Sequence, residues 1–232
     1  MILINFKAYE ESTGKNSVKL AKKAQKVALE TRKKIIVIPE AIDLEKVAKK
    51  VSIDVYTLHV DEKDYGANTG SILIEAAQQA GAKGTIINHS ENRIPMEKIQ
   101  KTVEKAKRLG FPVIVCVKDM EEAKKVDQFS PDYIAYEPPE LIGGDVSVST
   151  AKPEVIRDIV NSVKTKIIVG AGVKNKKDVE KCIELGAVGV LVASGVVKAK
   201  TAKNAIQDLA EGLKGDRKRY SETWGRRHQE SK

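Results

Sequence analysis

Eight short apolar runs, rich in β-branched residues, recur along this chain with polar segments of helical length between them. Runs that are apolar on both faces are typical of strands buried in a parallel sheet. A chain that alternates strands and helices builds such a sheet with right-handed crossovers. The runs occupy residues 2–6, 35–38, 54–58, 84–88, 113–117, 133–136, 166–169 and 188–192.

The number and spacing of these units predict how the sheet closes. A spacing below about 30 residues is that of a minimal βα unit, and eight such units close into a (β/α)8 barrel of about 250 residues. An open doubly wound sheet is the structural alternative, but it usually has a Gly-rich turn after its first strand. This chain has Lys-Ala-Tyr-Glu there. We therefore predict an α/β protein with one barrel domain, residues 1–213, and a short basic C-terminal extension, residues 214–232.

Composition limits the cellular location and the kinds of partner that we expect for the protein. The 232 residues include 41 Lys+Arg and 32 Asp+Glu, and the net charge of +9 suggests anionic partners. No apolar run approaches the roughly 20 residues of a membrane span, and the first ten residues lack the features of a signal peptide. Cys116 and Cys182 are too few for a disulfide framework and are not spaced as a metal-binding pair. We expect a cytoplasmic protein without membrane association, with the helical lysines in a solvated outer ring.

The C-terminal extension allows two interpretations. Tyr220 and Trp224 lie among arginines there, and such a segment could stack on single-stranded nucleic acid. The two aromatic residues are also an i,i+4 pair, which would pack a terminal helix on the barrel or on a neighbouring subunit. We favour the packing role and do not expect a nucleic-acid partner.

Polar residues stand at the carboxyl ends of three predicted strands, where barrels of this kind carry their active sites. Asn5 and Lys7 end the first strand, and alternation places both side chains on the inner side of the mouth. His89 follows the fourth strand and Glu137 follows the sixth. Each could be an ordinary surface or structural residue when taken alone. Together, a lysine, a histidine and a carboxylate at one mouth indicate acid–base chemistry.

Small residues follow the last two predicted strands. These are Gly170-Ala171-Gly172 and Ala193-Ser194-Gly195. Small residues let backbone N–H groups approach an anion closely, and the usual phosphate site of this barrel lies in those two loops. The pair of loops therefore predicts a phosphorylated ligand.

Several of these segments, taken in order, resemble the triosephosphate isomerase family in its short archaeal form. The matching motifs are Asn5-Phe6-Lys7, the segment from Asn88 to Arg93 and the segment from Tyr136 to Gly143. The two small-residue loops resemble the phosphate loops of the family, and the segment from Tyr65 to Gly70 resembles its protruding dimer loop. The resemblance spans roughly residues 1–213 and implies a TIM barrel.

The resemblance implies an activity and a set of roles. The reaction would interconvert dihydroxyacetone phosphate and D-glyceraldehyde 3-phosphate through an enediolate, in glycolysis and gluconeogenesis, without a metal or organic cofactor. Glu137 would be the catalytic base, neutral His89 the electrophile, and Lys7 the cation that offsets the developing charge. The implied substrate-binding residues are Asn5, Lys7, Ile142, Gly143, Gly172, Ala193 and Ser194. Glu91 would either orient Lys7 through an ion pair or be an ordinary acid at a helix N-terminus.

The resemblance also implies assembly and a lid. The loop from Tyr65 to Gly70 would build a homodimer or homotetramer by inserting beside a neighbour's active site. The segment after Glu137 would close over the substrate, but the usual Gly-Thr-Gly near its end is Gly143-Gly144-Asp145 here. We therefore expect weaker closure than in the family pattern.

Two other function classes remain open. The chain could be another phosphosugar isomerase or epimerase, although an epimerase would need metal ligands that we do not find in the sequence. It could also be a non-catalytic phosphate-binding barrel.

Overall fold

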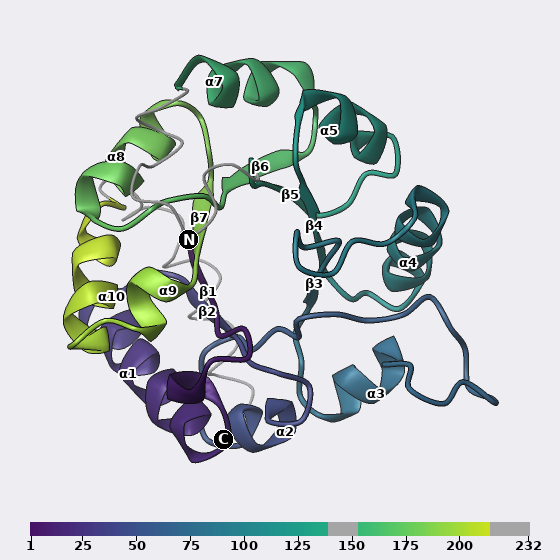
Figure 1. The fold of residues 1–232 in the computed structure, drawn as a ribbon, viewed down its shortest axis with the longest axis horizontal. Coiled ribbons are helices and arrows are strands. Elements are labelled where there is room, and N and C mark those ends of the chain that lie inside the picture. Colours follow the sequence, from purple (N-terminus) through teal and green to yellow (C-terminus); the bar gives the residue numbers. More distant parts are fainter. Residues whose placement is uncertain (139–152, 214–232) are drawn as a thin grey trace, which may run out of the picture.

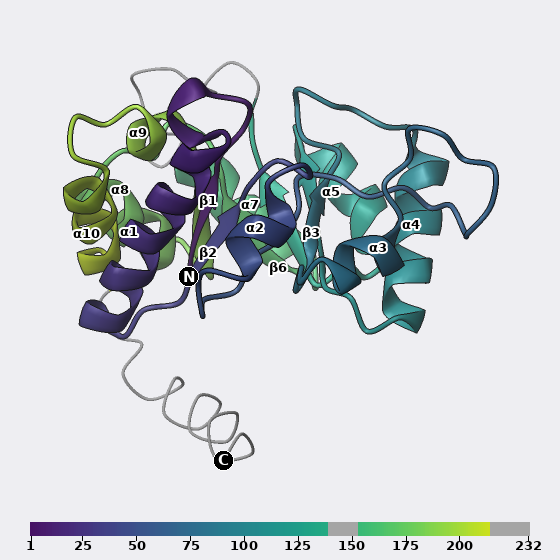
Figure 2. The same cartoon turned by 90° about the horizontal axis from the view of Figure 1, so that it is seen from below.

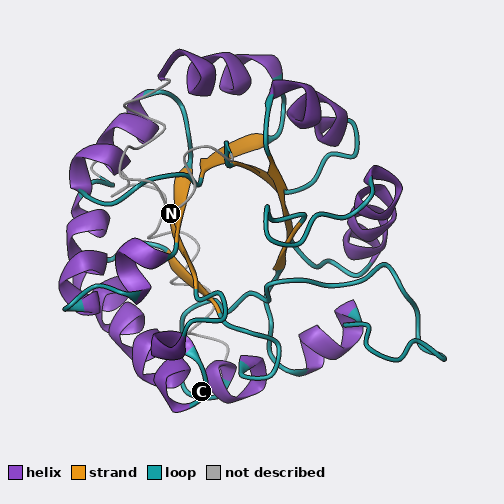
Figure 3. Ribbon diagram, viewed as in Figure 1, coloured by secondary structure: helices purple, strands orange, loops and turns teal. Residues whose placement is uncertain are grey.

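A computed structural model describes residues 1–138 and 153–213 of the chain. Within these residues, parallel strands form one sheet in the order β2-β1-β7-β6-β5-β4-β3, curved into a ring (Figures 1 and 3). The strands are β1 (Ile2–Asn5), β2 (Ile35–Ile38), β3 (Thr85–Ile87), β4 (Val113–Val117), β5 (Tyr133–Tyr136), β6 (Lys166–Val169) and β7 (Gly189–Val192). The parallel register, for example Ile2 opposite Ile35 and Ile2 opposite Val190, confirms the predicted barrel.

The predicted strand at residues 54–58 is the one that does not form a regular ladder. Val55 makes a single bridge to Val37 of β2, and Thr57 makes a single bridge to Thr85 of β3. The segment therefore divides its backbone hydrogen bonds between two neighbours and is not a strand in its own right. It nevertheless fills the gap between β2 and β3 and closes the ring.

Helices surround the ring on its outer side (Figures 1 and 2). They are α1 (Lys15–Thr31), α2 (Leu44–Ala48), α3 (Ile74–Gln79), α4 (Met96–Arg108), α5 (Met120–Asp127), α7 (Pro153–Ser162), α8 (Lys176–Glu184), α9 (Ser194–Val197) and α10 (Ala202–Glu211), with a 3₁₀ turn, η1 (Glu10–Ser12). Pro95 immediately precedes α4 and Gly110 follows it with a φ of 60°, as expected of residues that start and stop a helix.

Strand alternation separates two layers of core. Side chains such as Ile2 and Ile4 face the helices, whereas Leu3, Ile114 and Ile168 belong to a smaller cluster that fills the barrel interior. Leu3 and Ala135 belong to this interior cluster, and Asn5 and Glu137, two positions further along the chain, line the cavity at the mouth. Alternation stops at Asn88, whose positive φ redirects the chain before His89.

Some predictions fall outside the described residues. The lid segment, including Ile142 and Gly143, and the extension at residues 214–232 are among them. Within residues 1–138 and 153–213, no helix is long and apolar enough to cross a membrane.

Candidate active site

One cavity lies at the carboxyl ends of the strands and collects the polar residues predicted there. Its lining includes Asn5, Lys7, His89 and Glu137, together with the small residues Gly172, Ala193 and Ser194. These residues come from the ends of β1, β3, β5, β6 and β7. The convergence on one mouth that the sequence predicts is therefore what the fold produces.

Lys7 is held at the mouth by its own backbone turn. Its φ is 48°, a left-handed conformation that is uncommon for a side-chain-bearing residue. The buried Asn5 side chain accepts a hydrogen bond of 2.8 Å from the backbone N–H of Lys7, which stabilises this turn. The Lys7 ammonium forms a 2.7 Å ion pair with Glu91. Glu91 is more than half exposed, so the ion pair orients the ammonium more than it stabilises the fold.

His89 is buried as a neutral imidazole. Burial, and then the positive charge of Lys7, lower the pKa of His89 to about 4. Its Nδ1 accepts a 3.1 Å hydrogen bond from the backbone N–H of Glu91. A nitrogen that accepts carries no proton, so the proton is on Nε2. That nitrogen lies 3.6 Å from Oε1 of Glu137.

Glu137 is the buried carboxylate of the cavity. Burial raises the pKa of Glu137 to about 7, and a hydrogen bond from the Cys116 thiol and the charge of Lys7 oppose this rise. Its Oε2 has no hydrogen-bond partner among the described residues. An unpaired oxygen on a desolvated carboxylate with a pKa near neutrality is suited to accept a proton.

Gly170 gives Glu137 the room it occupies. A Cβ at position 170 would lie 2.8 Å from Cγ and 2.9 Å from Oε1 of Glu137. Such distances are too short for real Cβ contacts, so a side chain here would displace the carboxylate. Sequence reasoning assigned Gly170 only to a phosphate loop, and its contact with the base depends on strand register.

The turn that carries His89 is braced by residues that the sequence analysis did not single out. Asn88 adopts a φ of 58°, which asparagine tolerates better than most residues. Its amide donates to the backbone carbonyl of Cys116 at 2.8 Å and to Glu122 at 3.1 Å. Glu122 also forms a 3.2 Å ion pair with Arg93. Asn88 and Arg93 therefore tie the turn that carries His89 to β4 and α5.

Two polar residues of the cavity lining were not predicted from the sequence. Tyr9 and Lys174 line the cavity beside Lys7 and Gly172. The ring of Tyr9 contacts the Lys198 ammonium, which lies 4.3 Å from its centroid. Both residues are in loops just after strands, and only the loop position could have suggested them.

A carboxylate, an imidazole and an ammonium at the carboxyl ends of the strands are typical of a (β/α)8 enzyme that works by acid–base chemistry. The chain belongs to the triosephosphate isomerase family, because the model of that family matches residues 1–209. It is thus an isomerase, as the resemblance implied.

Individual relatives agree with this assignment. Triosephosphate isomerase of Methanothermus fervidus is 46% identical over 214 residues, which cover 90% of this chain and 96% of that protein. Triosephosphate isomerase of Methanocaldococcus jannaschii is 45% identical over 214 residues, covering 90% and 98%. A crystal structure of triosephosphate isomerase from Bartonella henselae is 20% identical, with a TM-score of 0.73 and coverage of 92% and 98%. This last likeness supports the fold alone.

Proposed function

We propose that this chain interconverts dihydroxyacetone phosphate and D-glyceraldehyde 3-phosphate by proton transfer through an enediolate. The observation that carries the proposal is the pairing of a buried carboxylate with a neutral imidazole, 3.6 Å apart, in the mouth of a barrel of this family. A proton next to a carbonyl needs a positioned base and a donor at the developing oxyanion, and the pair supplies both.

Each group has one role in this proposal. Glu137 removes the proton from the carbon next to the carbonyl and returns it to the adjacent carbon. The Nε2–H of His89 donates to the carbonyl oxygen and then moves protons between the two oxygens. Lys7 offsets the negative charge of the enediolate, and Asn5 orients a substrate oxygen. A low-dielectric cavity strengthens these interactions because little water competes for the charges.

The phosphate group would bind at the small residues of the cavity lining. Gly172, with a φ of 66°, and the pair Ala193 and Ser194 bring backbone there without bulky side chains. Ile142 and Gly143 would complete this grip, although both lie outside the described residues. Lys174 adds a cationic side chain to the lining of the same cavity. No metal or organic cofactor enters the proposed reaction.

A coupled assay separates this proposal from its alternatives. Purified protein is given D-glyceraldehyde 3-phosphate, and formation of dihydroxyacetone phosphate is followed by its reduction. We expect turnover that a chelator does not change. Activity only on another phosphosugar would favour a different isomerase or epimerase. Saturable phosphate binding without any turnover would favour a non-catalytic barrel.

The pH dependence follows from the two pKa values. Glu137 must be ionised to accept a proton, and its pKa is raised to about 7, so kcat/KM should fall about tenfold per pH unit below that value. His89, with a pKa of about 4, should stay neutral throughout and give no second limb above pH 5. A pH profile of kcat/KM that stays flat from pH 5 to pH 8 would contradict this account.

Replacing Cys116 should change the pH at which kcat/KM begins to fall. The thiol lowers the pKa of Glu137, so Cys116→Ala should shift the acidic limb of kcat/KM to higher pH. Cys116→Ser keeps a hydroxyl donor and should stay closer to the wild type. The phosphate of the substrate also titrates, near pH 6, but its pKa is the same for every variant. Identical limbs for all three proteins would show that the thiol does not tune the base.

We also propose a homodimer or homotetramer built through the loop from Tyr65 to Gly70, in the cytoplasm. Tyr65 is 67% exposed and Ile42 is 86% exposed, and they are two of the three exposed large hydrophobic residues found in the described chain. Both lie on loops at the mouth end of the barrel, the first after the bridging segment and the second after β2. A second copy of this chain that covered these side chains would bury apolar surface, which favours association.

A further inference from the structure

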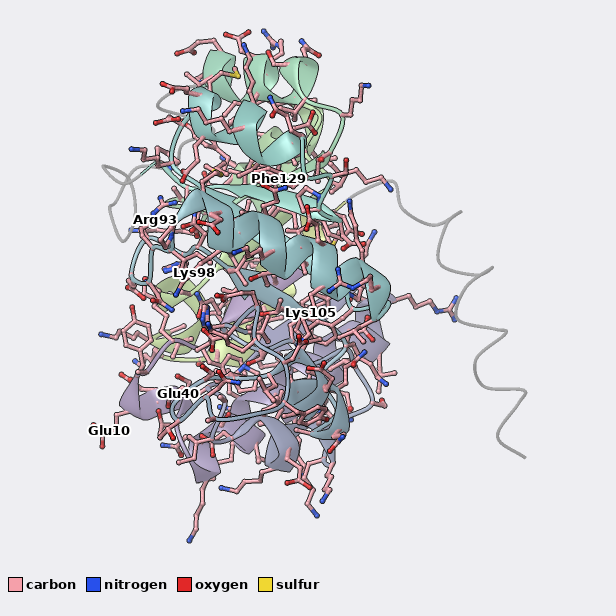
Figure 4. The ribbon with its side chains drawn as sticks, turned by 90° about the vertical axis from the view of Figure 1, so that its right-hand side faces the viewer. Glu10, Glu40, Arg93, Lys98, Lys105 and Phe129 are labelled. Carbon is pink, nitrogen blue, oxygen red and sulfur yellow. The ribbon has the colours of Figure 1, made fainter. Side chains whose placement is uncertain are left out.

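Lys105 on α4 is a lysine that the protein buries. Only 4% of the residue is exposed, whereas the side chain of Lys101, one turn earlier on the same helix, is 57% exposed. The expectation that helical lysines lie in a solvated outer ring is therefore wrong for Lys105. Figure 4 looks onto the flank of the barrel that carries α4, with Lys105 labelled. A buried ammonium needs partners that satisfy its charge and its donors.

The Lys105 ammonium has three donors and meets three acceptors. It donates a hydrogen bond to the backbone carbonyl of Lys63, and it lies 3.1 Å from Asp64 and 3.0 Å from Glu75. Burial alone would lower the pKa of Lys105, but the hydrogen bonds to Glu75 and Asp64 raise it above its ordinary value. The lysine thus joins α4 to α3 and to the chain just before Tyr65.

The chain that Lys105 contacts is the base of the protruding loop, residues 61–73. Its two legs are closed by a bridge between Asp61 and Leu73, with backbone hydrogen bonding from Asp61 to Ile72 at 2.8 Å. The loop lies in the segment between α2 and α3, which projects outward from the ring of helices (Figures 1 and 2). Because a projecting loop buries little of its own surface, contacts at its base must fix its direction.

We propose that Lys105 is a positioning residue for self-assembly, which holds the protruding loop in the shape that a second copy of this chain accepts. This inference rests on the assembly put forward under Proposed function. Its physical basis is the entropy of association. A loop already fixed in the free chain, by the contacts of Lys105 with the Lys63 carbonyl and with Asp64, loses less freedom when a partner binds. Asp64 is 87% exposed, so the lysine holds the loop from beneath and leaves its outer face to the partner.

The test compares Lys105→Met with Lys101→Met by sedimentation over a range of concentrations. Methionine keeps the apolar stem and removes the ammonium. We expect the dissociation constant of Lys105→Met to rise about tenfold or more, from the added cost of ordering the loop. Lys101→Met should stay close to the wild type, since its exposed pair with Glu97 lies within α4 and solvent screens its weaker attraction to Glu62 of the loop.

A second variant separates a specific effect on assembly from a loss of folding stability. Lys105→Met leaves the Glu75 carboxylate without its partner, which can be destabilising, whereas an apolar pair in place of an ion pair is often neutral. The double variant Lys105→Met with Glu75→Leu should therefore fold as the wild type by circular dichroism and still assemble weakly. Hydrogen exchange at the Ile72 amide, which donates to the Asp61 carboxylate at 2.7 Å, should be faster in both Lys105 variants.

The outcomes are distinct. A wild type that is monomeric at micromolar concentration overturns the proposed assembly, and with it the role of Lys105 in assembly. A wild type that assembles while folded Lys105 variants keep the same dissociation constant overturns only the role of Lys105. Weak assembly together with faster exchange of the loop supports it.

Discussion

Glu137→Gln is expected to lower kcat by about 10²–10⁴-fold, the range that a positioned general base contributes. The amide occupies the same buried space but cannot accept the proton. Glu137→Asp keeps the charge and withdraws the carboxylate by one methylene, a misplacement that can cost on the order of 10²-fold. Turnover is measured in the coupled assay at saturating D-glyceraldehyde 3-phosphate.

A matched variant controls for the loss of a carboxylate in general. Glu184, on the outer helix α8, is 67% exposed and pairs with Lys181. Glu184→Gln should leave kcat unchanged. The assignment of the base is falsified if both Glu137 variants keep wild-type turnover.

The next largest effect is expected from one added methyl group. Gly170→Ala places a Cβ within 3 Å of Glu137 and must displace its carboxylate. A shift of about 1 Å can cost on the order of 10²-fold in rate. We therefore expect kcat to fall about that much, and circular dichroism is measured alongside to check that the barrel is intact.

A double variant tests the cause of that loss. In the Glu137→Gln protein the base is already lost, so displacing the side chain at position 137 should cost little more, and Gly170→Ala should lower turnover less than in the wild type. Two losses that simply multiply would mean that Gly170 acts independently of the base, and the steric argument would fail.

The sequence predicted the frame of this protein well because strand period and polarity are local properties. The runs at 35–38, 113–117, 133–136 and 166–169 coincide with β2, β4, β5 and β6. The run at 54–58 has the same composition but divides its hydrogen bonds between two neighbours. The hydrophobic pattern of a segment does not show with which neighbouring strands its backbone will form hydrogen bonds.

The site was predicted as a set of residues, but only one contact between them, the Lys7–Glu91 ion pair, was among the expectations. From the sequence, Cys116 was considered only for disulfide or metal binding, whereas in the structure it is buried and lies opposite Ala135 in the sheet. That register brings its thiol close to Glu137, the first residue after β5. Register between strands distant in sequence is a tertiary property, so the link between thiol and base appears only in the structure.

The neutral state of His89 was implied by the family resemblance, but the sequence does not show which groups surround the ring. In the structure Nδ1 accepts from the backbone N–H of Glu91, and burial and Lys7 are the main causes of the lowered pKa. Lys105 is a similar case, because a lysine on a polar helix gives no sequence signal of its buried partners.

The most direct measurement is the isomerisation of D-glyceraldehyde 3-phosphate in D₂O, followed by NMR of the product. Proton removal by Glu137 through an enediolate lets the abstracted proton exchange with solvent before it is returned. The account therefore predicts deuterium at the new carbon–hydrogen bond of dihydroxyacetone phosphate with the wild type, and almost no product with Glu137→Gln. Rapid product formation by Glu137→Gln, with solvent deuterium incorporated as in the wild type, would contradict it.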